Sequence, residues 1–147
     1  MAKRSRKIEH AGPCRRQYPL REANRALVLV RGIVTDVVSD YVRLVDLQEV
    51  IEAAQAAGRS DRLEEARVEV ARLVEKLQRA LEELELLGLE LKDWSLGVVD
   101  FPSLADGREV RLTWQLGQDR IRSWHEIHNP TLQPIDTLPE ESYAVRR

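Results

Sequence analysis

The feature that most constrains this chain is a long stripe of apolar residues that begins at Leu20. The residues of the stripe follow one another at alternating steps of three and four, which places them on one side of an α-helix and is typical of heptad repeats. They are Leu20, Ala23, Leu27, Val30, Val34, Val37, Tyr41 and Leu44. The pattern predicts one helix that continues to about Ala56 and has a length on the order of 50 Å.

A second apolar stripe follows a short break in the pattern. Gly58 can adopt the left-handed conformation that ends a helix, and Asp61 with Glu64 three residues later matches a capping box at the start of the next helix. The second stripe consists of Leu63, Ala66, Val70, Leu73, Leu77, Ala80, Leu84 and Leu87. Because the loop between them is short, the two helices are predicted to form an antiparallel hairpin over residues 19–88.

The periodicity changes from helical to alternating after Gly88, which indicates strands rather than a third helix. Extended pieces are expected at 89–92, 98–101, 109–116 and 121–127, with turns near residues 95–97, 106–107 and 117–119. In the third piece, Val110, Leu112 and Trp114 share one face. The predicted fold class is α+β, a long coiled-coil-like antiparallel helical hairpin followed by a small antiparallel β-sheet over residues 89–128.

The 147 residues are enough for one domain with a real core, which is expected to span residues 18–128. Residues 1–17 are rich in Lys and Arg and contain almost nothing to bury, so they are expected to form a basic flexible tail. Residues 129–147 contain three prolines and are expected to form an extended tail.

The helical stripes predict more than a monomer. Ile33, Val38 and Val45 widen the stripe of the first helix, so this helix is expected to pack against more than one neighbour. Two helices cannot cover both stripes by themselves, and either the β unit or a second chain must cover the rest. The widened stripe favours a homodimer.

Composition excludes several classes of partner. The formal net charge of −2 predicts no general affinity for nucleic acid or for an anionic membrane, and only the basic N-terminal tail could contact phosphate. No apolar run reaches the roughly 20 residues of a membrane span. The basic start lacks the apolar stretch of a signal peptide, and a single cysteine, Cys14, suits a reducing compartment, so a cytoplasmic location is expected.

The chain contains no phosphate-binding glycine loop, Cys/His zinc pattern or nucleophile elbow. The residue with the most chemical interest is His125, in the last predicted strand, because imidazole is a common metal ligand and acid–base group. His128 would point to the opposite face of that strand, so a second ligand must come from another element. The alternative interpretation of His125 is a histidine that is hydrogen-bonded within a sheet.

Six blocks of the chain resemble, in the same order, those of a small prokaryotic family known as the domain of unknown function 2203. The blocks are Tyr18–Asn24, Leu87–Asp93, Gly97–Pro102, Asp106–Val110, Trp114–Gly117 and Trp124-His125. The resemblance implies a shared fold and supplies no activity. It also implies that the recurring polar residues of the family are Glu22, Asn24, Lys92, Asp100, Arg108 and His125 here. Family members often continue with an acidic, Gly-Phe-containing segment, which residues 128–134 replace in this chain.

Two hypotheses about function follow. The first is a dimeric helical-hairpin module that docks a protein partner, because the helices supply most of the ordered length and no complete catalytic set is visible. The second is a protein that binds a metal or small anion, with enzyme activity left open, at the junction of helix and sheet. There His125 would bind a divalent metal ion with Glu22 or Asp100, and Arg108 would hold an anion.

Overall fold

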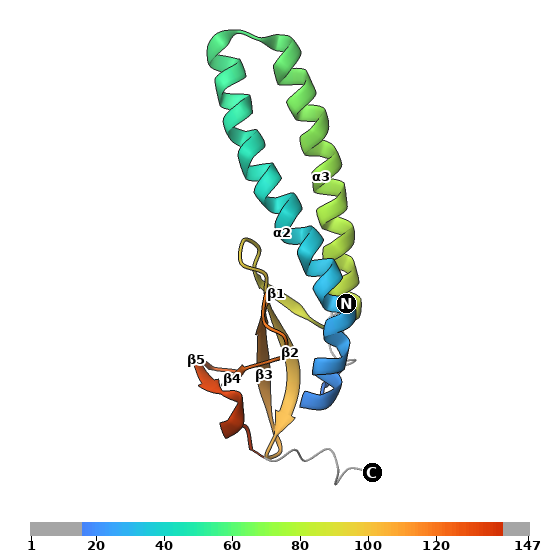
Figure 1. The fold of residues 1–147 in the computed structure, drawn as a ribbon, viewed down its shortest axis with the longest axis vertical. Coiled ribbons are helices and arrows are strands. Elements are labelled where there is room, and N and C mark those ends of the chain that lie inside the picture. Colours follow the sequence, from blue (N-terminus) through green and yellow to red (C-terminus); the bar gives the residue numbers. More distant parts are fainter. Residues whose placement is uncertain (1–15, 140–147) are drawn as a thin grey trace, which may run out of the picture.

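The protein is described here from a computed structural model, which places residues 16–139. Helix α2 spans Leu20–Ala57 and helix α3 spans Ser60–Leu86. The two helices run antiparallel side by side and form the long upper part of the molecule (Figure 1). The helical hairpin predicted from the two apolar stripes is confirmed.

The turn between the helices follows the prediction at its first residue only. Gly58 has φ 68° and ends α2 in the left-handed conformation. Asp61 is not a cap, because α3 begins one residue before it and Arg59 occupies the capping position without a side-chain hydrogen bond. The Asp61 carboxylate instead pairs with the Arg59 guanidinium at 3.2 Å, which lowers the pKa of Asp61. It also carries negative charge into the first turn of α3, where the helix dipole favours it.

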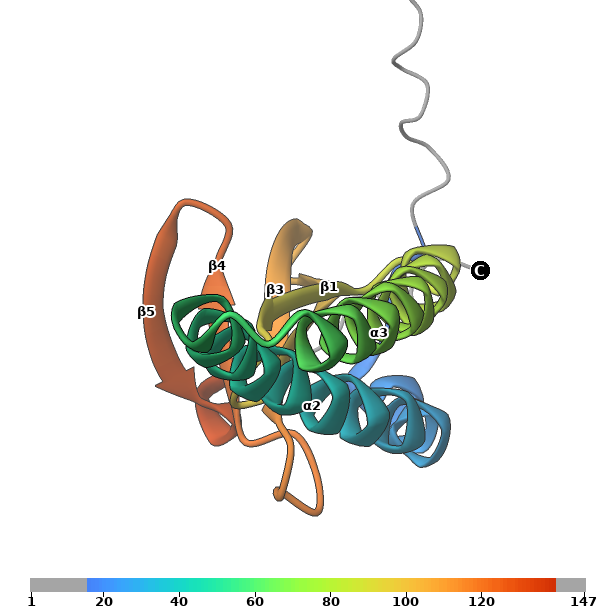
Figure 2. The same ribbon diagram turned by 90° about the horizontal axis from the view of Figure 1, so that it is seen from above.

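A five-stranded antiparallel sheet follows the hairpin, with the strands side by side in chain order. The strands are β1 (Glu90–Asp93), β2 (Val98–Ala105), β3 (Arg108–Gln115), β4 (Ser123–Glu126) and β5 (Asn129–Pro134). The fold class is therefore α+β, as predicted. Seen from above, β4 and β5 lie at the side of the sheet farthest from α3 (Figure 2).

The end of the sheet differs from the sequence prediction. Residues 129–134 do not leave the domain as a tail but form the edge strand β5, followed by a short 3-10 helix at Ile135–Thr137. Pro130 and Pro134 fit an edge strand, because proline lacks the N–H that an inner strand must donate. Ile135 and Leu138 then pack against the main core, which holds this segment to the domain. Residues 1–15 and 140–147, which include most of the predicted basic tail and Cys14, lie outside the described residues.

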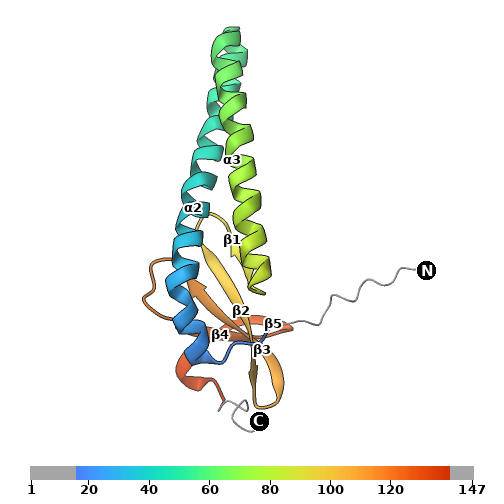
Figure 3. The same cartoon turned by 90° about the vertical axis from the view of Figure 1, so that its right-hand side faces the viewer.

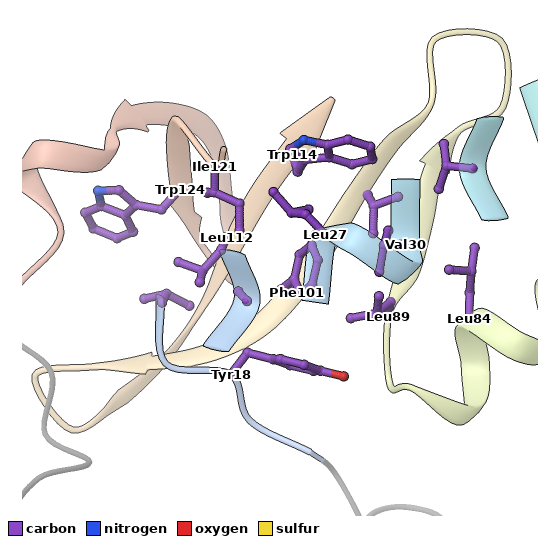
Figure 4. Packing of buried hydrophobic residues seen from close by; sticks show 14 of the residues in the cluster. Tyr18, Leu27, Val30, Leu84, Leu89, Phe101, Leu112, Trp114, Ile121 and Trp124 are labelled. Carbon is purple, nitrogen blue, oxygen red and sulfur yellow. The ribbon is translucent and has the colours of Figure 1, made fainter. Parts of the chain in front are cut away.

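The main core lies between the lower half of α2 and one face of the sheet (Figure 3). Alternate residues of β2 and β3 meet the stripe of α2 there, and Figure 4 shows the side chains from the two layers packed together. The fully buried members include Leu27, Val30, Val34, Val99, Phe101, Leu112 and Trp114. The sheet therefore covers much of the apolar stripe of α2.

Tyr18 joins the hairpin to the sheet at the base of this core. Its ring packs edge-on against Phe101 with the centroids 5.3 Å apart, and its hydroxyl donates to the backbone oxygen of Leu87 at 2.6 Å. Its backbone N–H donates to Pro102, and its backbone oxygen accepts from the buried Ser103 hydroxyl at 2.6 Å. One residue thus fixes the start of α2, the end of α3 and strand β2 relative to one another.

Tyr18 leads to a testable pH dependence. Burial raises the pKa of its phenol, so the folded protein keeps the phenolic proton to a higher pH than the unfolded chain does. The stabilisation from Tyr18 is complete below the ordinary pKa of about 10 and is lost as the pH rises through the folded-state value. We expect Tyr18→Phe to cost about 1 kcal/mol of unfolding free energy at neutral pH, and the difference from wild type to shrink above about pH 10. Urea unfolding at both pH values measures the two differences, and a constant difference would contradict this account.

The upper half of the hairpin has only a small core of its own, formed by Leu47, Ala66 and Leu73 with a few half-buried neighbours. Ion pairs on its surface join the helices, between Arg43 and Glu69 at 2.8 Å and between Lys76 and Asp40 at 3.3 Å. None of the helices among residues 16–139 is long and apolar enough to cross a membrane.

Candidate functional site

The polar residues of the sheet gather on the face that α2 does not cover. Asp100 on β2 is paired in register with Thr113 on β3, and Arg111 on β3 is paired with His125 on β4. Because side chains alternate between faces along a strand, all four side chains belong to the face opposite Phe101 and Leu112. We call this the outer face of the sheet.

Asp100 is the centre of the group on the outer face. It is 3% exposed, which is rare for an ionisable side chain unless it is paired. The Thr113 hydroxyl donates to its Oδ1 at 2.7 Å, and Nε2 of His125 lies 3.0 Å from its Oδ2. The interaction between Asp100 and His125 therefore bridges β2 and β4 across the strand between them.

His125 has hydrogen-bond partners at both ring nitrogens. Nδ1 lies 2.7 Å from the backbone oxygen of Glu126, which can only accept, so this partner assigns a proton to Nδ1. Both ring nitrogens therefore have partners within the sheet, and the pair with Asp100 links β4 to β2.

A depression of about 420 Å³ lies beside this group on the outer face. Its lining residues include Arg16, Glu85, Glu90, Asp100, Glu109 and Arg111. Carboxylates outnumber guanidinium groups there, and both oxygens of Asp100 already have partners within the sheet. The depression therefore does not supply the positive charge that an anion site needs.

Arg108 does not reach the outer face. Its guanidinium makes two hydrogen bonds to the Glu126 carboxylate, at 3.0 and 2.6 Å, and these bonds lower the pKa of Glu126. Glu126 is paired in register with Val110, which places it on the core side of the sheet. Arg108 thus ties the start of β3 to the end of β4 and is not an anion clamp for His125.

The other polar residues implied by the family resemblance also lie apart from His125. The side-chain oxygen of Asn24 accepts from the backbone N–H of Ile121 at 2.8 Å, which fixes the loop before β4 to α2. Glu22 is exposed in the first turn of α2, the helix that covers the opposite face of the sheet. Lys92 lies on the edge strand β1 and pairs with Glu90 at 3.6 Å.

The trio of His125, Glu22 and Asp100 is therefore reduced to a pair. Within residues 16–139, no three His, Cys, Asp or Glu side chains come together in a way that could hold a metal ion. Of the six candidate residues, the structure brings together Asp100 and His125, and it places the other four in separate contacts.

The sequence interpretation missed Thr113 and Arg111, which complete the polar group. The signal was available, because the alternation that places Val110, Leu112 and Trp114 on the core face places Arg111 and Thr113 on the other face. This alternation does not by itself indicate a site, because polar residues are common on the outer face of a sheet. Only the register of the strands shows that Thr113 lies beside Asp100.

A family model described as an uncharacterized conserved protein, DUF2203, matches residues 16–132. The match includes both helices and most of the sheet, and so exceeds half of the chain. The chain belongs to the DUF2203 family. No curated protein and no solved structure matches it significantly.

Membership of DUF2203 confirms the resemblance inferred from the six blocks. The matched region begins two residues before Tyr18 and ends within β5, so it covers the junction of hairpin and sheet described above. Asn24 holds α2 to the loop before β4 at this junction, and the contact of Asp100 with His125 joins β2 to β4 within the sheet. In this DUF2203 member their contacts explain how the fold is fixed.

Proposed function

We propose that this DUF2203 protein is an interaction module in which the helical hairpin binds a partner protein and the sheet holds the base of the hairpin rigid. The observation that carries the proposal is the upper half of the hairpin, which extends beyond the sheet (Figure 1) and keeps apolar side chains in solvent. Val42 and Val45 of α2 are each 48% exposed there. The dimeric state expected from the widened stripe is a separate part of the proposal.

The surface proposed for docking, called the docking face below, consists of Val42, Val45, Val74 and Leu96. Val42 and Val45 continue the line of Val38 on α2 at helical spacing. The ion pairs between Asp40 and Lys76 and between Arg43 and Glu69 place Val74 of α3 at the same level of the hairpin. These side chains supply apolar positions from both helices.

The turn between β1 and β2 forms the lower boundary of the docking face. Trp94 packs against Tyr41 of α2 with the ring centroids 5.7 Å apart, which anchors the turn to the hairpin. Leu96, in the same turn, remains 54% exposed. An occupant of the docking face would therefore meet apolar side chains from the hairpin and from the turn.

The proposed occupant is an amphipathic helix of another protein, with basic residues beside its apolar side. A third helix would cover apolar positions on two helices at once, which is the helix-in-groove mode of recognition. Asp46 and Glu49 of α2 are exposed just beyond Val45, and neither lies within ion-pair distance of a described cation, although Asp46 acts electrostatically on Arg43. Their negative charge favours a basic partner over an acidic one.

A photo-activated cross-linking side chain tests this proposal in cells that produce the protein. It is introduced at Val42 or at Val45, and in a control at Leu132, which is 54% exposed on β5. We expect both hairpin positions, but not position 132, to recover one and the same heterologous protein. Adducts that contain only a second copy of the chain, or adducts that are equal at all three positions, would overturn the docking proposal.

The purified partner provides the quantitative arm of this experiment. Val45→Glu places a charge in the apolar contact and should weaken binding at least about tenfold, or about 1.4 kcal/mol. Val68→Glu is the matched control, because Val68 is equally apolar and 54% exposed but lies outside the docking face. Equal effects of the two substitutions would reject the docking face as the binding surface.

The metal- or anion-binding alternative draws less support from the geometry. A metal ion at His125 would have to displace either Asp100 or the backbone oxygen of Glu126 from a ring nitrogen. Arg108, the proposed anion clamp, is paired with Glu126. The nucleic-acid hypothesis concerns residues 1–16, almost all of which lie outside the described residues.

A further inference from the structure

We infer that two copies of this chain associate through a groove at the base of the hairpin, with the α2 helices antiparallel across a two-fold axis. The inference deepens the dimeric part of the proposed function by naming its surface and register. It uses a side of the hairpin that does not include the docking face.

The groove lies between α2 and α3 and has a volume of about 680 Å³. Its α2 wall includes the apolar Val28, Leu29 and Ile33 with Gly32, and its α3 wall consists of Ala80 with the charged Lys76, Arg79 and Glu83. Val28 is 81% exposed and Leu29 is 56% exposed, although their neighbours Leu27 and Val30 are buried in the main core. The sheet covers the other side of α2, so nothing described within the chain covers this apolar surface.

Gly32 is the residue that points to close approach of a second chain. It lies inside a 38-residue helix, well away from either end, where glycine is less favourable than alanine by about 1 kcal/mol. Its φ is not positive, and a Cβ added to it would meet no atom within 4 Å, so the fold of the single chain does not require glycine there. A glycine on an exposed helix face leaves a hole that a large side chain from a neighbouring helix can fill.

Two charges of α2 flank Leu29 and Gly32 on the same side of the helix, and one of them, Asp36, also lines the groove. Arg25 lies one helical turn before Leu29, and Asp36 lies one turn after Gly32. Both are exposed, and neither has an ion-pair partner within the part of the chain that the structure describes. They lie 11 residues apart on one helix, about 16 Å, so they do not pair with each other within the chain.

A second α2 helix complements this pattern when it runs antiparallel about a two-fold axis between residues 30 and 31. Leu29 of one copy then lies opposite Gly32 of the other, which places a large side chain over a hole. In the same register, Arg25 lies opposite the second copy's Asp36, and the symmetry makes each of these pairings twice. The sequence Arg25, Leu29, Gly32, Asp36 has the four-three-four spacing of a helix seam, and the opposite charges at its two ends favour the antiparallel direction.

Charge reversal tests both the surface and the register. Sedimentation velocity over a concentration series should show a dimer for the full-length protein. Arg25→Asp and Asp36→Arg each replace two attractive pairs with two repulsive ones, so each should raise the dimer dissociation constant by about tenfold or more. Glu82→Arg is the matched control, a charge reversal at an exposed site of α3 outside the groove, and should leave the dissociation constant unchanged.

Restoration of the pairs distinguishes this register from a general charge effect. An equimolar mixture of Arg25→Asp and Asp36→Arg chains should form a heterodimer about as stable as the wild-type dimer, because both pairs are opposite in charge again. The double variant should likewise recover the homodimer. A wild-type monomer at all concentrations, a dimer insensitive to the single reversals, or a mixture as weak as its components would each overturn the inference. The failure of the docking proposal remains distinguishable, because Val45→Glu leaves the groove intact.

Discussion

Asp100→Ala is expected to lower the free energy of unfolding by about 3 kcal/mol, although the Asp100 side chain lies on the outer face of the sheet. The substitution removes the acceptor for the Thr113 hydroxyl and the partner of His125 Nε2, both in a largely buried setting. A buried donor that loses its partner stays without a hydrogen bond, because water cannot reach it freely. The loss of unfolding free energy is therefore larger than the loss caused by removing a surface ion pair. Urea unfolding followed by far-UV circular dichroism measures this difference.

Asp100→Asn is the matched control for the Asp100→Ala experiment. The amide keeps an acceptor for Thr113, and its NH₂ group can donate to a neutral imidazole. We expect the asparagine variant to lose only about 1 kcal/mol. If Asp100→Ala loses no more than Asp100→Asn, the interaction with Thr113 and His125 is not a brace across the strands, and a role for Asp100 outside the fold becomes the better explanation.

His125→Ala completes the test as a double-mutant cycle. If Asp100 and His125 stabilise the sheet through each other, the loss in the double variant should be smaller than the sum of the two single losses. The difference reports the coupling between the two side chains. Additive losses would indicate that each residue acts through other contacts.

The helical part of the fold could be predicted because its signal is local and repeated. Each turn of α2 contributes a core residue at the same spacing, and Gly58 ends the helix through its own backbone conformation. The β part was predicted less completely, because strand length depends on which neighbour supplies the hydrogen bonds. Pro102 favours an early end of β2, because proline has no N–H for a neighbouring strand. In the structure β2 continues through Pro102, which pairs with β3 on one side. On its other side no strand among residues 16–139 pairs with it, and the backbone oxygen of Pro102 accepts a hydrogen bond from the Tyr18 N–H.

The candidate site could be predicted only in part, because the polar character of two residues does not show that they lie close together in the fold. His125 and Asp100 meet because the register of β2, β3 and β4 brings them within reach, and no spacing along the chain encodes that register. Glu22 and Arg108 are equally polar, but the helix face and the strand parity place them elsewhere. Polar residues that recur in a family can stabilise its fold or take part in a reaction. Here the contacts of Asn24 and of Asp100 with His125 join parts of the fold.

The second large effect is expected at Gly97, where the turn between β1 and β2 passes closest to α2. Gly97 has φ 75°, a conformation that costs an alanine on the order of 1–2 kcal/mol. A Cβ at this position would also lie 2.9 Å from Leu116 Cβ and 2.9 Å from Val34 Cγ1, with Val38 only slightly farther away. Crowding in a packed core adds a further 1–3 kcal/mol, so we expect Gly97→Ala to lower the free energy of unfolding by about 3–4 kcal/mol in total.

Gly58→Ala separates the two causes of this loss. Gly58 has φ 68°, close to that of Gly97, but a Cβ there would meet no atom within 4 Å. Its alanine variant should therefore show the backbone cost alone, about 1–2 kcal/mol. The excess loss in Gly97→Ala measures how tightly the turn is held against α2, and this contact also orients Trp94 and Leu96 for the proposed docking face. If the two glycine variants are equally stable, the turn can move away from α2, and the lower boundary of the docking face is not fixed by the fold.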